Sequence, residues 1–273
     1  MKVHPTAIVD PAARIAADVE IGPYTVIGAE ASIAEQSRIG SHVVIEGDVQ
    51  IGARNVIGHG AIIGAPPQDL SFDPKRHSGV RIGTDNIIRE LCTIHRGTLE
   101  GSMTTLGDKN FLMAGAHVGH NCRIANNAII ANNCLLGGYV EINDSAFLGG
   151  GCVFHPFVRV GRLAITQGGS AFSKDIPPFL IATGPNCVVG INVVGLRRAG
   201  FRSVERDEIK AAFKSLFLSG LNTTQALARA GEKTWSHNAR EFFDFVASAK
   251  KRGICAYRRT NKERMEGCAP SRP

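Results

Sequence analysis

Residues 15–64 read IAADVE-IGPYTV-IGAEAS-IAEQSR-IGSHVV-IEGDVQ-IGARNV-IGHGAI-IG, and an isoleucine opens every block of six. Nine isoleucines keep this spacing from Ile15 to Ile63, and six of them are followed by glycine. The same period returns downstream in two further registers, first at Ile82, Ile88 and Ile94 and then through ten apolar residues from 106 to 160. A repeat of this regularity indicates the architecture before any single residue does.

A period of six fits neither the turn of an α-helix nor the alternation of a simple strand. It predicts a triangular coil, in which three blocks close one turn and successive turns stack at the strand spacing of about 4.8 Å. The repeated aliphatic side chain points inward, and Gly, Asn and Asp tolerate the backbone angles of the sharp corners. We therefore expect an all-β left-handed parallel β-helix of hexapeptide repeats over residues 1–185.

The cysteines support this register. Cys92, Cys122, Cys134 and Cys152 each follow a repeat aliphatic residue by four positions, where a small inward side chain is needed. Cys134 and Cys152 are one full turn apart and should stack as small apolar groups rather than bind a metal. The chain has 7 cysteines and no CxxC pair, which is typical of a reducing compartment and indicates the cytoplasm.

Two interruptions and a change of pattern divide the chain. Residues 65–81 and 95–105 break the repeat and are predicted to be protruding loops, where function often resides. After Ile176-Pro177-Pro178 helical signals begin, which predicts a small α-helical domain over residues 186–250. In that domain we expect Ser203 to cap a helix through Leu218, Thr223 or Thr224 to start a second helix, and Ser236 to precede a third.

Charge and hydropathy exclude some functions. The net charge is +7, but the segment from Lys250 onward carries eight Lys or Arg against two Glu, so the rest of the chain is nearly neutral. We interpret residues 251–273 as a basic, solvated, disordered tail and expect no binding to nucleic acid. The N-terminus lacks the apolar run of a signal peptide, and no window approaches about 20 apolar residues, so stable membrane insertion is not expected.

The densest polar cluster of the coil is Ala116-His117-Val118-Gly119-His120-Asn121. A histidine with its ordinary pKa near 6.5 can act as a general base at neutral pH, which favours a catalytic role for this segment. A zinc site is the other chemical option, since histidines can converge between subunits. The histidines available for it are His95, His117, His120 and His155.

Several ordered motifs resemble the UDP-N-acetylglucosamine acyltransferase family over about residues 3–250. They are His4-Pro5-Thr6-Ala7-Ile8-Val9, Gln68-Asp69-Leu70, Thr93-Ile94-His95-Arg96-Gly97-Thr98, the His117/His120 segment, Asp175-Ile176-Pro177-Pro178 and Asn192-Val193-Val194-Gly195-Leu196-Arg197-Arg198. The resemblance implies a homotrimer with active sites between neighbouring coils. It also implies transfer of a β-hydroxyacyl group to the 3-hydroxyl of UDP-N-acetylglucosamine, the first step of lipid A biosynthesis. The acyl donor would be carried on the phosphopantetheine of acyl carrier protein, with no bound cofactor and no metal.

The resemblance also implies roles for individual residues. His120 matches the general base, the backbone N–H of Gly138 matches the oxyanion donor, and Asn121 would orient the His120 ring. Gly168 matches a position at which a side chain would shorten the acyl channel. The remaining matches line the substrate pocket: Gln68, Asp69, His117 and His155 at the sugar and acyl group, and Asn192 and Arg198 at the nucleotide.

Four positions depart from the family pattern. Asn121 stands where an acid is usual, Tyr139 where histidine is usual, Pro156 replaces a glutamine and Ser71 replaces a lysine. These departures leave open an N-acyltransferase acting on a 3-amino nucleotide sugar. The sequence is also compatible with a γ-class carbonic anhydrase-like zinc enzyme and with a non-catalytic β-helix scaffold.

Overall fold

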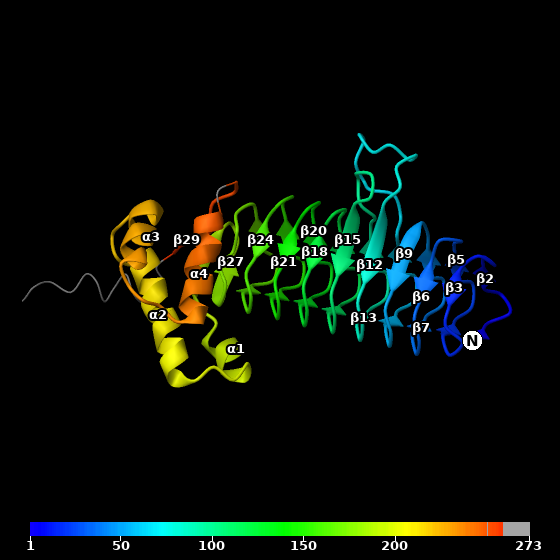
Figure 1. Ribbon diagram of the computed structural model, residues 1–273, viewed down its shortest axis with the longest axis horizontal. Coiled ribbons are helices and arrows are strands. Elements are labelled where there is room, and N and C mark those ends of the chain that lie inside the picture. The colour runs from blue at the N-terminus through cyan, green and yellow to red at the C-terminus, as the bar shows by residue number, and fades with distance from the viewer. Residues whose placement is uncertain (250, 259–273) are drawn as a thin grey trace, which may run out of the picture.

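The computed structural model describes residues 1–249 and 251–258 and shows a left-handed parallel β-helix with helices at its C-terminal end (Figure 1). Short strands alternate among three sheets, which form the three faces of the coil. Sheet A contains β1 (Lys2–Val3), β4 (Glu20–Ile21), β7 (Arg38–Ile39), β10 (Val56–Ile57), β13 (Ile87–Ile88), β16 (Phe111–Leu112), β19 (Ile129–Ile130), β22 (Phe147–Leu148), β25 (Ile165–Thr166), β27 (Leu180–Thr183), β28 (Cys187–Ile191) and β29 (Ala256–Tyr257). Sheet B contains β2 (Ile8–Val9), β5 (Val26–Ile27), β8 (Val44–Ile45), β11 (Ile62–Ile63), β14 (Thr93–Ile94), β17 (His117–Val118), β20 (Leu135–Leu136), β23 (Val153–Phe154) and β26 (Ala171–Phe172). Sheet C contains β3 (Arg14–Ile15), β6 (Ser32–Ile33), β9 (Asp48–Ile51), β12 (Gly79–Ile82), β15 (Met103–Leu106), β18 (Arg123–Ile124), β21 (Glu141–Ile142) and β24 (Arg159–Val160).

The register of the coil confirms the predicted six-residue repeat. Ile21 pairs with Ile39, Ile27 with Ile45 and Ile33 with Ile51, in parallel and one turn apart. The repeat isoleucines from Ile21 to Ile63 are all buried, whereas Ile15 is partly exposed at the open N-terminal end. The four cysteines of the repeat are fully buried, as expected for small inward side chains. Stacked aliphatic side chains therefore form one continuous core along the coil axis.

The corner between sheets C and A contains an internal ladder of asparagines, which the six-residue pattern does not predict. Asn55 Oδ1 accepts hydrogen bonds from the backbone N–H and the side-chain amide of Asn86, at 2.9 and 3.0 Å. Asn86 Oδ1 in turn accepts from the N–H of Asn110 at 2.8 Å, and Asn110 Oδ1 from that of Ala128 at 2.8 Å. The ladder satisfies backbone N–H groups at corners that would otherwise be buried without partners.

The two protruding loops leave the same edge of the coil in consecutive turns (Figure 1). The first connects β11 to β12 and spans residues 64–78, and the second connects β14 to β15 and spans 95–102. Both are shorter than predicted, because residues 79–81 and 103–105 already pair as strands of sheet C. Ser78 Oγ donates to the carbonyl of Gly97 at 2.6 Å, and the N–H of Gly101 donates to the carbonyl of His77 at 2.7 Å. The loops therefore brace each other.

Four helices cover the C-terminal end of the coil: α1 (Val193–Arg198), α2 (Ser203–Phe217), α3 (Thr223–Gly231) and α4 (His237–Ser248). The starts predicted at Thr223 and after Ser236 are confirmed. Ser203 is not the cap of α2, because it is the first helical residue and Arg202 is the N-cap. The carboxylate of Glu205 accepts the Arg202 N–H at 2.8 Å, which satisfies one of the free backbone donors at this helix end.

The segment after α4 returns to the coil. β29 pairs with β28, and Cys255 is fully buried. The prediction of a disordered tail is therefore wrong for residues 251–258, because Ile254 bridges to Asp175 and β29 completes sheet A. The rest of the predicted tail, 259–273, lies outside the described residues. Among the described helices, none has the length and apolar character needed to span a membrane.

Candidate active site

Most of the predicted site residues lie along one edge of the coil, the corner between sheets B and C, which we call the B–C edge. His117 is the outward residue of β17, and His120 belongs to the turn that follows it. A corresponding corner follows β20 and β23 in the next two turns of the coil. Both protruding loops also start from this edge. In chain order the edge presents Gln68, Asp69, His117, His120, Asn121, Gly138 and His155.

The imidazole of His120 is held by its neighbour in the sequence. His120 Nδ1 lies 3.0 Å from Asn121 Oδ1, and Asn121 is only 8% exposed. Asn121 Oδ1 also accepts the backbone N–H of Thr98 at 3.0 Å, so the second loop reaches the partner of the ring. Nε2 of His120 has no hydrogen-bond partner within the described part of the chain. This nitrogen is therefore available to a substrate.

Gly138 lies one turn of the coil beyond His120 and packs directly against its ring. A Cβ at Gly138 would lie 2.9 Å from His120 Nδ1 and closer still to Cε1 and Nε2. Only a glycine leaves room for the imidazole in this position. The Gly138 carbonyl accepts the Phe157 N–H at 3.0 Å, whereas no described residue accepts the Gly138 N–H. A free backbone donor thus lies beside the available nitrogen of His120.

His117 and His95 form a second pair of rings on the same edge. Thr93 Oγ1 lies 2.7 Å from His117 Nδ1, and the His95 and His117 rings meet edge to face at 5.0 Å. Burial, reinforced by His95 and His120, lowers the pKa of His117 to about 4. Burial also lowers the pKa of His95, and His120 adds to the effect. Both rings are therefore neutral near pH 7 and can provide hydrogen bonds without charge.

The first loop brings a carboxylate to this edge. Asp69 Oδ1 accepts from the N–H and the hydroxyl of Ser71, at 2.9 and 2.8 Å. These two bonds lower the pKa of Asp69, and the nearby His120 lowers it further. Gln68 and His155 are exposed on the same edge, and His155 Nδ1 lies 3.3 Å from the carbonyl of Pro156.

Three predicted residues lie on other edges. Asn192 caps α1, with its side chain accepting from Gly195 and donating to the carbonyl of Leu163 at the corner between sheets C and A. Arg198 is exposed at the end of the same helix. Gly168 is exposed in the turn between β25 and β26, at the corner between sheets A and B. A single chain therefore does not bring the predicted nucleotide-binding residues to His120.

The described residues contain no group of three His, Cys, Asp or Glu side chains arranged to hold a metal ion. The histidines considered for zinc instead contact each other and neutral partners. The six described cysteines are free, and burial raises the pKa of Cys92 to about 11 and that of Cys122 to about 12.

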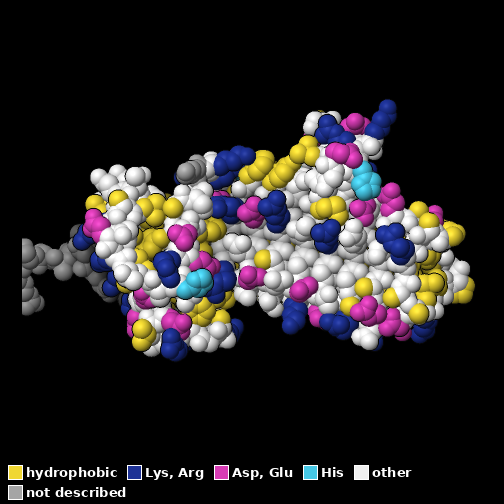
Figure 2. Space-filling view, in the orientation of Figure 1, with side chains coloured by type: hydrophobic (Ala, Val, Ile, Leu, Met, Phe, Trp, Pro, Cys, Tyr) yellow, Lys and Arg dark blue, Asp and Glu magenta, His cyan; other side chains and the backbone are white. Residues whose placement is uncertain are grey.

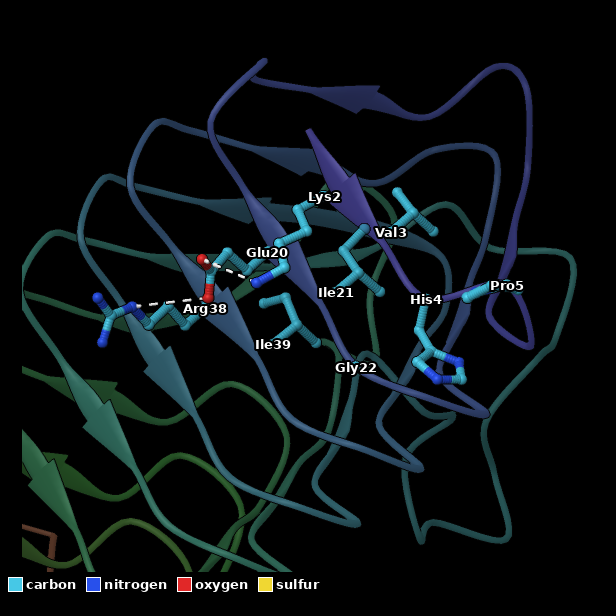
Figure 3. Close-up of a pocket in the computed structure, with 9 residues that line it drawn as sticks. All are labelled: Lys2, Val3, His4, Pro5, Glu20, Ile21, Gly22, Arg38 and Ile39. Atoms are coloured by element: carbon cyan, nitrogen blue, oxygen red, sulfur yellow. Dashed lines mark ion pairs between the residues drawn. The ribbon is translucent and has the colours of Figure 1, made fainter.

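A hollow at the N-terminal end is distant from this edge in sequence and carries different groups (Figure 3). Val3, Ile21 and Ile39 form its apolar side, at the open end where the coil begins. Glu20 lies between two cations there, 3.9 Å from Lys2 and 4.0 Å from Arg38. It is the open end of the core and contains none of the predicted site residues.

Sequence reasoning assigns no role to two residues that contact the His120–Asn121 pair. Thr98 Oγ1 lies 2.9 Å from Asn121 Oδ1 and 3.1 Å from the hydroxyl of Tyr139. The Tyr139 ring meets the His120 ring edge to face at 5.4 Å. Thr98 belongs to one of the family motifs and Tyr139 departs from the family pattern, but only the folded loop shows that they meet.

The chain is similar to proteins with one named activity. The profile described as UDP N-acetylglucosamine O-acyltransferase, Domain 2, matches residues 175–255, and that of the bacterial transferase hexapeptide repeat matches 103–138. Acyl-[acyl-carrier-protein]–UDP-N-acetylglucosamine O-acyltransferase of Burkholderia orbicola is 48% identical, covering 85% of this chain and 88% of the relative. The protein of the same name from Janthinobacterium is 46% identical, covering 92% and 98%.

Solved structures agree over nearly the whole chain. The UDP-N-acetylglucosamine acyltransferase of Francisella novicida superposes with a TM-score of 0.89 at 34% identity, covering 99% of this chain and 100% of that one. The enzyme from Arabidopsis superposes with a TM-score of 0.80 at 28% identity, covering 93% and 99%. The coil and the helical end are thus shared as one arrangement.

Proposed function

Because this chain belongs to the acyl-[acyl-carrier-protein]–UDP-N-acetylglucosamine O-acyltransferase family, we propose that His120 is the general base of an acyl transfer at the B–C edge. The activity is the transfer of an acyl group from acyl carrier protein to UDP-N-acetylglucosamine, the first step of lipid A biosynthesis. The observation that carries the assignment of the base is the geometry of His120. Its Nδ1 lies against the Asn121 amide oxygen while Nε2 remains available.

In the proposed reaction, Nε2 of His120 takes the proton of the sugar 3-hydroxyl as that oxygen attacks the thioester carbonyl of a β-hydroxyacyl group. The carbonyl oxygen becomes an oxyanion, which accepts a hydrogen bond from the free N–H of Gly138. Collapse of this intermediate forms the ester and expels the phosphopantetheine thiolate of acyl carrier protein, which takes the proton from His120. The chain therefore needs no cofactor of its own.

The outward rows of the sheets support a trimer. Sheet B presents apolar residues outward over most of its length, including Ile8, Val26, Ile62, Leu135 and Val153. Sheet A does the same from β10 onward, with Val56, Ile87, Phe111, Ile129, Phe147 and Ile165. Sheet C presents mainly Arg, Ser, Gln, Thr and Glu, and charged side chains are scattered over the coil face drawn in Figure 2. A closed ring of three needs two different buried faces on each protomer, which fits two apolar faces and one polar face.

This packing accounts for the residues that one chain keeps apart. If sheet B of one protomer faces sheet A of the next, the B–C edge of the first lies beside the C–A edge of the second. The B–C edge carries His120, and the C–A edge carries Asn192 and Arg198. We therefore propose that a neighbouring protomer supplies the nucleotide-binding residues, while Gln68, Asp69, His117 and His155 contact the sugar and acyl groups from the first protomer.

Gly168 is the proposed limit of the acyl channel. A Cβ there would lie 3.1 Å from the carbonyl oxygen of Gly150, a tight contact, so glycine keeps this exposed turn free of a side chain. We propose that the channel admits a relatively long acyl chain for this reason. A cytoplasmic location is proposed as well, since the six described cysteines carry free thiols.

The decisive experiment supplies purified protein with UDP-N-acetylglucosamine and a mixed pool of acyl carrier protein thioesters and identifies the products by mass spectrometry. His120→Ala should lower kcat by about 10²–10⁴-fold, the usual contribution of a general base. His237→Ala, at an exposed first residue of α4, is the control and should retain activity. Unchanged transfer by His120→Ala would contradict the mechanism.

The same assay separates the competing functions. With the 3-amino nucleotide sugar offered beside the hydroxyl acceptor, turnover of the amino sugar alone would show an N-acyltransferase. A protein that transfers nothing to either acceptor would favour the scaffold interpretation. Elemental analysis of the purified protein tests the remaining function: stoichiometric zinc that a chelator removes would favour the carbonic anhydrase-like enzyme.

Oligomeric state tests the trimer separately. Val26→Glu places a charge on the outward row of sheet B and should dissociate the assembly in light scattering coupled to size exclusion. Ser32→Glu, at the equivalent outward position of sheet C, should leave it intact. Dissociation by both variants or by neither would contradict the assignment of the faces.

A further inference from the structure

A buried hydrogen-bond chain joins Tyr139 to His120 through Thr98 and Asn121. The Tyr139 hydroxyl lies 3.1 Å from Thr98 Oγ1, and Thr98 Oγ1 lies 2.9 Å from Asn121 Oδ1. Asn121 Oδ1 lies 3.0 Å from His120 Nδ1. Thr98 and Asn121 are 7% and 8% exposed, so water reaches this chain poorly and its direction is set by the protein.

The direction of every bond in the chain follows from one backbone donor. The Thr98 N–H lies 3.0 Å from the Asn121 side chain and can only donate, so the atom facing it is the amide oxygen. Since Asn121 Oδ1 accepts, His120 Nδ1 must carry the proton it shares with that oxygen. The Thr98 hydroxyl likewise donates to Asn121 Oδ1, which leaves its own oxygen to accept the proton of Tyr139.

We propose that Thr98 and Tyr139 are positioning residues that hold His120 in the tautomer with a proton on Nδ1 and a lone pair on Nε2. The proposal rests on the proposed function, because only a base acting through Nε2 needs this tautomer. It assigns a catalytic purpose to the loop 95–102, which supplies Thr98 from outside the six-residue repeat. It also gives Tyr139 a role in the reaction as a donor at the far end of the chain.

The surrounding structure holds both residues in place. The Tyr139 ring lies between two others, stacked on Phe157 at 4.8 Å and 10° and edge to face with His120 at 5.4 Å and 88°. Arg76 donates to the Thr98 carbonyl at 3.3 Å, which ties the second loop to the first. The Tyr139 and Phe157 rings hold the plane of the His120 ring, and the hydrogen bonds to Asn121 Oδ1 keep the imidazole proton on Nδ1.

An uncharged partner distinguishes this arrangement from a histidine–carboxylate pair. The amide oxygen orients the ring through its lone pairs, and up to three donors converge on it, namely the Thr98 N–H, the Thr98 hydroxyl and His120 Nδ1. An amide oxygen has two lone pairs, so these donors share them. Removing one donor therefore changes how firmly the others are held.

Kinetics with matched substitutions test the positioning role. Thr98→Val keeps the shape and the backbone N–H but removes the hydroxyl. It should lower kcat about 10-fold with KM nearly unchanged, because a hydrogen bond within a network contributes more than the same bond between an isolated pair. Thr98→Ser should restore most of the activity. Tyr139→Phe keeps the ring stack and should lower kcat less than Thr98→Val does. Thr25→Val, which removes a buried hydroxyl bonded to Gly40 far from this edge, is the control and should leave kcat unchanged.

The tautomer itself is measured without substrate. Solid-state ¹⁵N spectra of protein labelled at its 9 histidines, compared with those of His120→Gln, isolate the His120 signals. We expect protonated Nδ1 and unprotonated Nε2 in the native protein and in Thr98→Ser. In Thr98→Val the backbone N–H still binds Asn121 Oδ1, so the same tautomer should persist, but the His120 signals should broaden because the amide is held less firmly. A native His120 protonated on Nε2, or a Thr98→Val variant with native His120 line widths and native kcat, would overturn the proposal. If the spectra agree but UDP-N-acetylglucosamine is not acylated, the proposed function fails while the hydrogen-bond arrangement around His120 stands.

Discussion

Gly138 lies so close to His120 that its missing side chain is what admits the ring. An added Cβ would come within 2.9 Å of His120 Nδ1 and nearer to two other ring atoms. The same glycine carries the free N–H proposed for the oxyanion. One residue thus sets both the place of the base and the place of the donor beside it.

We predict that Gly138→Ala preserves the coil but displaces His120. Because small errors in the position of a catalytic group are costly, kcat should fall about 100-fold. Circular dichroism should show an unchanged β-helix. Gly190→Ala is the control, since nothing lies within 4 Å of a Cβ there, and its activity should be native.

Asn121→Asp should move the acid limb of the pH–rate profile to higher pH. The carboxylate would occupy the same site beside His120 Nδ1, and a negative charge at that distance favours the protonated ring. Initial rates measured between about pH 5 and 9 would show the shift. A profile identical to that of the native protein would mean that residue 121 does not act on the base; Asn121→Leu, which offers no acceptor, should be nearly inactive.

The protein should lose stability as the pH falls from about 6.5 toward 4. His117 has its pKa lowered from 6.5 to about 4 by burial and by two neighbouring histidines. Between these values the unfolded chain binds more protons than the folded one, so the contribution is complete above pH 6.5 and decreases with acidification. The Tm measured across this range should fall less steeply for His117→Gln than for the native protein. The exposed His237→Gln should reproduce the native slope.

Removing the middle residue of the asparagine ladder, Asn86, should strongly lower the free energy of unfolding. Asn86→Ala deprives the Asn110 N–H of its acceptor inside the core, which should cost about 2–4 kcal/mol of unfolding free energy once the small cavity is included. Urea denaturation followed by circular dichroism measures it. Asn132→Ala, at an exposed corner with negative φ, should cost less, and equal losses would show that the ladder adds nothing beyond packing.

The coil is predictable because its physics repeats. Each hexad presents one aliphatic side chain inward, so the residues from Ile21 to Ile63 indicate the same inward row at every repeat. The buried cysteines of the repeat agree with this register. The helix starts at Thr223 and after Ser236 also follow from local signals. The cap predicted for α2 is wrong, because Ser203 is already helical and Arg202 occupies the N-cap position.

The loops behave differently. Their predicted lengths are too great, since nothing in Gly79 or Met103 alone shows that pairing with the neighbouring turn has already begun. The charge of residues 251–258 predicts a tail, yet β29 completes sheet A. In both cases the deciding contact is made to a segment far away in the sequence.

For this protein the amino-acid order alone determined the triangular coil, its inward rows and the family to which its motifs correspond, because those properties depend on spacing and on residue type. Only the tertiary structure decided that Thr98, Asn121 and Tyr139 meet around one imidazole. Their side chains come from a loop and from two turns of the coil, and hydrogen bonds depend on distances that no local pattern encodes.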